Sequence, residues 1–138
     1  SFFTPKVWKI RRPEPDADEL AEAIAAIKAA KNPVIVAGGG VIYSGAEAAL
    51  AAFASTHVIP VVETQAGKSS LAFDHPLNFG PVGVTGAASA NAVCEAADLV
   101  IGVGTFAHKI FGNLQVTVLA SETQHRVSIL IHFVDMER

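Results

Sequence analysis

The sequence predicts an α/β fold, with a mostly parallel sheet that has helices on both faces. Short, continuous apolar runs alternate along the chain with segments of helical period. Strands buried on both faces and connected by helices have this pattern. The first strand, helix and second strand also fit within about 30 residues, the length of one right-handed β-α-β unit. The 138 residues suit one domain.

Composition supports a packed domain and excludes several functions. Hydrophobic residues make up 51% of the chain and charged residues 17%, with a mean hydropathy of +0.41. This excess indicates that part of the surface faces another protein. The net charge is −3 and basic residues cluster only at 9–12, which argues against nucleic-acid binding. No apolar run reaches the roughly 18 residues of a membrane span. The single Cys94 excludes an internal disulfide and favours a reducing, cytoplasmic location.

Residues 1–15 are predicted to be a linker, because Pro5, Pro13 and Pro15 block regular structure. The chain begins with Ser1 and lacks the features of a signal peptide. We therefore expect a piece cut from a longer protein, with the domain itself spanning residues 16–138.

The first helix should begin at Asp16, which can cap it, with Glu19 at the spacing of a capping box. It should end at Asn32, because Pro33 disfavours helical dihedrals at the preceding residue. Its apolar residues recur at the helical period: Leu20, Ala23, Ile24 and Ile27.

A buried strand is predicted at residues 34–37, followed at once by three glycines. Ser44 and Glu47 form a second capping-box spacing, which predicts a helix to about Ser55 with Leu50 and Phe53 inward. The next strand lies within residues 58–62 and should start near Pro60.

The rest of the chain is less regular up to residue 86. Short helical or strand pieces are predicted at 69–72 and 77–80, and a helix of small residues at 87–97, entered from Thr85 as its cap. Strands are then predicted at 98–105, 116–119 and 129–134.

The glycine turn (Gly38, Gly39 and Gly40) follows a strand and precedes a helix, where α/β folds bind phosphate through free N–H groups. The dinucleotide fingerprint also needs glycine at position 43, which is Tyr43, although Glu63 sits where a ribose-binding acid would be. No P-loop lysine follows. Two alternatives stay open: phosphate binding, or glycines that only make a tight turn.

Other polar segments also end strands, at the edge where open α/β sheets bind ligands. Lys68 could pair with a phosphate or be an exposed surface lysine, and Thr85 could face an anion or only cap a helix. The shared placement of these segments at one sheet edge is stronger evidence for a bound ligand than any single segment is. The candidate positions are Thr64, Lys68, Gly83, Thr85, Gly104 and Thr105.

Catalytic groups are sparse. The five histidines show no metal-ligand spacing with cysteine or acids. His75 is interpreted as a turn residue and Cys94 as a small buried hydrophobe. Glu95 and Asp98 are interpreted as helix-end and surface acids.

Several motifs, in this order, resemble the central domain of thiamine-diphosphate-dependent enzymes, the group that includes acetohydroxyacid synthase. Within that group, Glu-Thr-Gln-Ala-Gly-Lys at 63–68 and Gly-Val-Thr-Gly at 83–86 are most similar to the enzymes that hydrolyse a cyclic dione in myo-inositol catabolism. The likeness covers residues 1–105, including Phe2, Phe3, Arg11 and Arg12 in the linker. The motifs lie at residues 31–41, 43–46, 60–68, 74–77, 83–86, 90–91 and 97–105.

The resemblance implies a Rossmann-like, nucleotide-binding domain with six strands in the order 3-2-1-4-5-6. It also implies a homo-oligomeric parent of three α/β domains that cleaves a C–C bond hydrolytically. In such enzymes the first domain carries the glutamate that activates thiamine. The third carries the Gly-Asp-Gly motif that holds Mg²⁺ and diphosphate. This chain has neither, so alone it should be inactive, with the other domains of the parent as its partners.

In some relatives the central domain holds FAD or ADP, and in others it is scaffold only. The resemblance places Gly38, Gly39, Gly40, Thr64, Lys68, Gly83, Thr85, Gly104 and Thr105 near such a cofactor. The alternatives are a stand-alone ADP, FAD or NAD module, an oligomerisation domain, or the central domain of another enzyme of the group.

The chain departs from the family at three places. Ser69 stands where the family usually has glycine, and Phe106 where it usually has arginine. Residues 106–127 show no match, and the tail could be diverged, rearranged or altered in the clone. Residues 129–135 could form the last strand.

Overall fold

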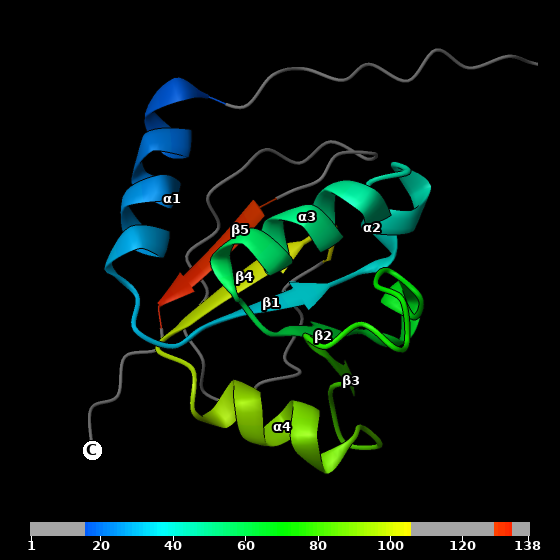
Figure 1. Ribbon diagram of the computed structural model, residues 1–138. Coiled ribbons are helices and arrows are strands. Elements are labelled where there is room, and N and C mark those ends of the chain that lie inside the picture. Colours follow the sequence, from blue (N-terminus) through cyan, green and yellow to red (C-terminus); the bar gives the residue numbers. More distant parts are fainter. Residues whose placement is uncertain (1–15, 106–128, 134–138) are drawn as a thin grey trace, which may run out of the picture.

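A computed structural model of the chain describes residues 16–105 and the backbone of residues 129–133 (Figure 1). Its sheet has five strands in the order β3-β2-β1-β4-β5, of which the first four are parallel and β5 is antiparallel to β4. This confirms the predicted α/β class. The strands are β1 (Pro33–Ala37), β2 (Val61–Glu63), β3 (Asn78–Pro81), β4 (Leu99–Val103) and β5 (Ile129–Phe133).

Helices cover both faces of the sheet: α1, α2 and α3 lie on one side and α4 on the other (Figure 1). Across the described ranges, none of the helices has the length and apolarity that a membrane crossing requires. The helices are α1 (Ala17–Ala29), α2 (Gly39–Tyr43), α3 (Glu47–His57) and α4 (Ala88–Glu95), with a 3₁₀ turn η1 (Gln65–Gly67) after β2.

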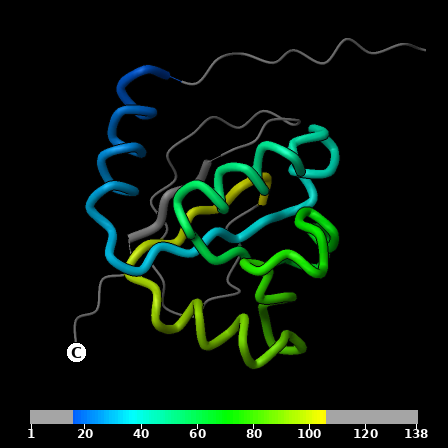
Figure 2. The backbone as a smooth tube through the Cα atoms, in the orientation of Figure 1, coloured from blue at the N-terminus to red at the C-terminus, as the bar shows by residue number. Residues whose placement is uncertain are grey.

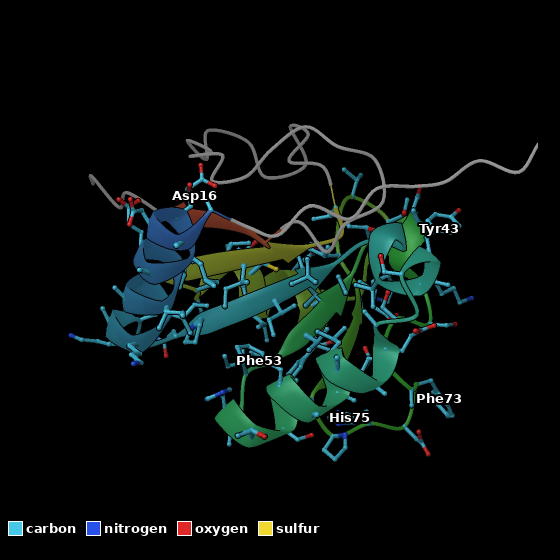
Figure 3. The ribbon with its side chains drawn as sticks, turned by 90° about the horizontal axis from the view of Figure 1, so that it is seen from above. Asp16, Tyr43, Phe53, Phe73 and His75 are labelled. Carbon is cyan, nitrogen blue, oxygen red and sulfur yellow. The ribbon has the colours of Figure 1, made fainter. Side chains whose placement is uncertain are left out.

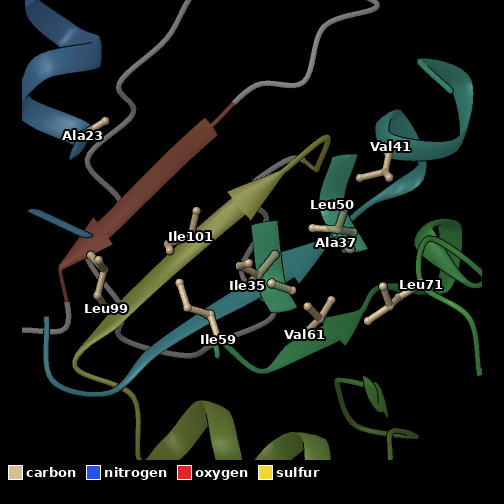
Figure 4. Close-up of a cluster of buried hydrophobic side chains, with 11 residues drawn as sticks. Ala23, Ile35, Ala37, Val41, Leu50, Ile59, Val61, Leu71, Leu99 and Ile101 are labelled. Atoms are coloured by element: carbon tan, nitrogen blue, oxygen red, sulfur yellow. The ribbon is translucent and has the colours of Figure 1, made fainter. Parts of the chain in front are cut away.

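The core has two halves because successive side chains of a strand point to opposite faces. Ile35 and Ala37 of β1 pack in the half under α1–α3, which Figure 4 shows, and Val34 and Val36 pack in the half above α4. All four are at most 2% exposed. Each large aliphatic side chain buried in this way contributes about 1.5–3 kcal/mol. The continuous apolar run therefore marks the centre of the fold.

The start of α1 is as predicted. The Asp16 carboxylate accepts hydrogen bonds from the N–H groups of Asp18 at 2.9 Å and Glu19 at 3.2 Å. Of the predicted apolar face, Ala23 is buried, but Leu20 and Ile24 are 38% and 44% exposed. The predicted helical period is confirmed, and Ala23 is its buried residue.

The predicted cap at Ser44 is wrong. Ser44 ends α2, a short helix that starts inside the glycine turn, and its hydroxyl is buried without a hydrogen-bond partner among the described residues. The following helix, α3, starts after Ala46, which has no side chain to cap it. Leu50 is buried as expected, but Phe53 is 38% exposed and packs against His57, with ring centroids 4.6 Å apart.

Two further boundaries differ from the prediction. The cap of α4 is Ala87 rather than Thr85, which is exposed and lies outside the helix. The piece predicted at 77–80 is β3, whereas residues 69–72 form turns and the short helix lies earlier, at η1.

The strand beside β4 also differs from the predicted order, which placed residues 116–119 there. Residues 129–133 occupy that position instead, and they run antiparallel, with Val100 opposite His132. The predicted linker at 1–15 and the strand at 116–119 lie outside the described residues.

Candidate functional site

The carboxyl ends of β1, β2 and β4 meet at one edge of the sheet, called the carboxyl edge below. The glycine turn follows β1, η1 follows β2, and Gly104 follows β4, so three loops gather there (Figure 2). A methyl group at Gly40 would lie 2.7 Å from the Cα of Gly104. One at Gly38 would collide with the Gly104 carbonyl and with Thr105. The structure thus brings five of the predicted residues together: Gly38, Gly39, Gly40, Gly104 and Thr105.

The glycine turn and the end of β4 are joined by backbone hydrogen bonds. The N–H of Gly38 donates to the Val103 carbonyl and the N–H of Gly40 to the Gly104 carbonyl, each at 2.9 Å. Gly104 has a φ of +61°, and a methyl group there would lie 2.6 Å from the nitrogen of Val41. Close approach of two backbones therefore explains why these positions are glycine.

The loop after β2 packs over the same turn. The N–H of Thr64 donates to the Ala37 carbonyl at 2.9 Å, and the Thr64 hydroxyl accepts from the N–H of Gly67 at 3.1 Å. A methyl group at Gly67 would collide with the Ala37 carbonyl, and one at Gly39 would lie 3.0 Å from the Ala66 carbonyl oxygen. Thr64 therefore serves as the cap of η1 and holds it against β1.

Two buried polar side chains fasten this loop. Glu63 is 6% exposed, and its Oε1 accepts from the N–H of Leu71 at 3.1 Å. Ser70 is fully buried, and its hydroxyl donates to the Gly38 carbonyl at 3.4 Å. Glu63 occupies the sequence position of a ribose-binding acid. In the structure the residue is buried, and its carboxylate accepts a hydrogen bond from the protein's own backbone.

Lys68 is exposed at the end of η1, and the next residue, Ser69, has a φ of +75°. The side chain of Tyr43, at the third fingerprint position, is 78% exposed at the outside of α2 (Figure 3). Neither side chain is buried against the glycine turn.

The loop with Gly83 and Thr85 is held separately. The Asn91 side chain accepts from the Gly83 N–H and donates to the Gly83 carbonyl, both at 3.0 Å. A methyl group at Gly86 would lie 2.6 Å from the Pro81 carbonyl oxygen. This loop is thus fixed by α4 and by its own turn, while Thr85 stays exposed.

Asp98 has a structural role that its interpretation as a surface acid missed. Its carboxylate accepts from the N–H groups of Lys31 at 2.7 Å and Asn32 at 2.8 Å, and so ties the turn before β1 to the start of β4. Partial desolvation raises the pKa of Asp98, but the backbone hydrogen bonds and the Lys31 charge outweigh this and lower the pKa below 3.8. Local spacing could not reveal it, because the partners are 66 and 67 residues away.

His75 links the loop after β2 to α3 (Figure 3). Its Nδ1 accepts from the Leu77 N–H at 3.2 Å, which places the ring proton on Nε2, 3.1 Å from the Ser55 hydroxyl. Both ring nitrogens are used in holding the loop, in agreement with its interpretation as a turn residue.

Cys94 does not have the properties of a nucleophile. Burial raises the pKa of its thiol to about 11, and the neighbouring Glu95 charge also raises it. The thiol therefore stays protonated at neutral pH. Among the side chains that the structure describes, no three or more His, Cys, Asp or Glu groups are placed to hold a metal ion.

A family model described as "Thiamine pyrophosphate enzyme, central domain" matches residues 20–137. The chain belongs to this family. The central-domain assignment agrees with the parallel sheet and with the resemblance found in the motifs.

Curated relatives of this central domain carry the name 3D-(3,5/4)-trihydroxycyclohexane-1,2-dione hydrolase. The protein from Geobacillus thermodenitrificans is 47% identical over 105 residues, and one from Clostridium perfringens is 51% identical over 104. One from Bacillus cereus is 49% identical over 104 residues. These alignments cover 75–76% of this chain but only 16% of each relative, so the chain spans a small part of the length of the curated relatives it matches.

Proposed function

We propose that this chain is the central domain of an enzyme that hydrolyses 3D-(3,5/4)-trihydroxycyclohexane-1,2-dione, breaking a C–C bond of the ring. The observation that carries the proposal is the 47–51% identity to hydrolases of that name. Thiamine diphosphate and Mg²⁺ would be held by other domains of the parent. The parent would be a cytoplasmic homo-oligomer, which the single cysteine and the apolar composition support.

The described residues do not fit a site for thiamine diphosphate and Mg²⁺. The sequence contains no Gly-Asp-Gly motif, and no acidic cluster for a cation occurs within residues 16–105. The buried acid at the carboxyl edge, Glu63, already accepts a backbone hydrogen bond. We therefore assign this domain a scaffold role, in which its rigid sheet sets the spacing of the catalytic domains.

A chimeric enzyme tests this role. The aligned 104 residues of the Clostridium perfringens hydrolase are replaced by those of this chain, and dione turnover is measured with thiamine diphosphate and Mg²⁺. A working scaffold retains turnover within about 100-fold of the parent, the loss that a displacement of about 1 Å far from the chemistry can cause. The unmodified parent is the control. A folded chimera with no turnover would contradict the proposal.

A further inference from the structure

We infer that the nucleotide crevice expected at the carboxyl edge is filled by the chain itself, and that neither ADP, FAD nor NAD binds there. The inference concerns the domain alone and holds whichever reaction the parent enzyme catalyses. It rests on the glycine turn, on the loop after β2, and on the charges of the described residues.

The first argument concerns the N–H groups. A phosphate at a glycine turn is held by backbone N–H groups that have no other acceptor. Here the N–H groups of Gly38 and Gly40 donate to the carbonyls of Val103 and Gly104 at 2.9 Å. A phosphate would have to replace both hydrogen bonds and leave the carbonyls of Val103 and Gly104, two half-buried residues, without these donors.

The second argument concerns space and polarity. Carbonyl oxygens lie close to the glycine turn. A methyl group at Gly38 would collide with the Gly104 carbonyl oxygen, and one at Gly39 would lie 3.0 Å from the Ala66 carbonyl oxygen. A methyl group at Gly40 would lie 2.7 Å from the Cα and 2.9 Å from the carbonyl oxygen of Gly104. A single methyl group at Gly38 or Gly40 would already be too close to this backbone. Carbonyl oxygens present negative charge, so this environment repels an anion as well as excluding it.

The third argument concerns Glu63, which could have bound a ribose. Glu63 is a buried residue, 6% exposed, and its carboxylate accepts from the Leu71 N–H. Turning it outward would leave that N–H unpaired in the core. It would also move a loop that Ser70 fastens to Gly38. The acid therefore holds the loop closed instead of facing a ligand.

The fourth argument concerns positive charge. Residues 16–105 contain three lysines and no arginine. Lys28 lies in the last turn of α1, and Lys31 lies just before β1, at the opposite end of that strand. Of these three described lysines, Lys68 alone is near the carboxyl edge, where it is exposed. One solvated lysine offers little stabilisation to a diphosphate.

The test is a titration of the ¹⁵N-labelled 138-residue chain with ADP, FAD and NAD up to about 1 mM, a concentration that detects even weak binding of about −4 kcal/mol. Amide signals of Gly38, Gly40, Gly67 and Leu71 are followed. We expect these amides to be protected from hydrogen exchange without nucleotide and to stay unshifted on its addition. Saturable shifts of the Gly38 and Gly40 amides would overturn the inference.

Glu63→Gln is the matched variant, because glutamine keeps the Oε1 acceptor for Leu71 and removes the charge. We expect this variant to leave the Gly38 and Gly40 amides unshifted by ADP, since packing and used N–H groups exclude the phosphate. Binding of ADP by the variant alone would show that charge excludes the nucleotide, and would overturn the argument from packing.

Discussion

Replacing Asp98 with alanine should destabilise the domain by about 1–2 kcal/mol. The carboxylate accepts two backbone hydrogen bonds, at 2.7 Å from Lys31 and 2.8 Å from Asn32, as a helix-capping side chain does. Such caps contribute about 0.5–2 kcal/mol, and the exposure of Asp98 keeps the value within that range despite its charge. In a domain of this size the loss corresponds to a fall of about 3–8 °C in Tm.

Urea unfolding of the wild type, Asp98→Ala and Asp98→Asn measures the effect. Asparagine keeps one acceptor oxygen, so its loss should be about half that of alanine. The hydrogen bonds lower the folded-state pKa of Asp98, so its stabilisation is present above the ordinary value of 3.8 and is lost as the pH falls through the folded-state value. The stability gap between wild type and Asp98→Asn should therefore be full at pH 7 and shrink below about pH 4. A gap that is absent at pH 7, or that widens in acid, would refute the reasoning.

Three further outcomes are expected. Val58 has a φ of 54° and is 73% exposed, so Val58→Gly should stabilise the domain by about 0.5–1 kcal/mol in urea unfolding; destabilisation would count against strain at this residue. Gly67→Ala should lower stability by about 1–3 kcal/mol, because its methyl group collides with the Ala37 carbonyl; an unchanged Tm by circular dichroism would contradict the packing described. With a pKa of about 11, Cys94 is only about 0.1% thiolate at pH 8, so iodoacetamide should alkylate it on the order of 100-fold more slowly than free cysteine; mass spectrometry measures this, and a rate equal to that of free cysteine would show an accessible thiolate.

The parallel strands were predictable because burial on both faces requires a continuous apolar run. Residues 34–37 and 99–103 show such runs, and they pair in the structure over Pro33–Ala37 and Leu99–Val103. The cap at Asp16 was also predictable, because a cap depends only on residues two and three positions away. In both cases the deciding interaction is local or is encoded in hydrophobicity.

Long-range contacts were not predictable in the same way. Ser44 and Glu47 have capping-box spacing, yet the backbone forms α2 first, because the glycine turn packs against Gly104 from a distant strand. The antiparallel pairing of β5 with β4 likewise joins residues about 30 positions apart along the chain, Val103 with Ile129 at the nearest pair and Leu99 with Phe133 at the farthest. Spacing along the chain carries no information about the partner or the direction of such a strand.

In the candidate site, too, the features set by the local pattern were predictable and those set by long-range contacts were not. The shared placement of the glycine segments at one edge followed from the strand pattern, whereas the use of their N–H groups did not. Glu63 occupies the position typical of a ribose-binding acid, but only the fold shows that its carboxylate accepts a hydrogen bond from the Leu71 N–H. Ser69, where the family usually has glycine, has a φ of +75°, so the family's preference has a conformational reason.

The most direct test of a scaffold role is dione turnover by the purified 138-residue chain with thiamine diphosphate and Mg²⁺. The related hydrolase from Clostridium perfringens serves as the positive control in the same assay. We expect no turnover above the background of buffer and cofactor, because the described residues provide no metal-ligand cluster and the Cys94 thiol stays protonated. Turnover by the chain alone at a rate comparable with that of the control would contradict the account.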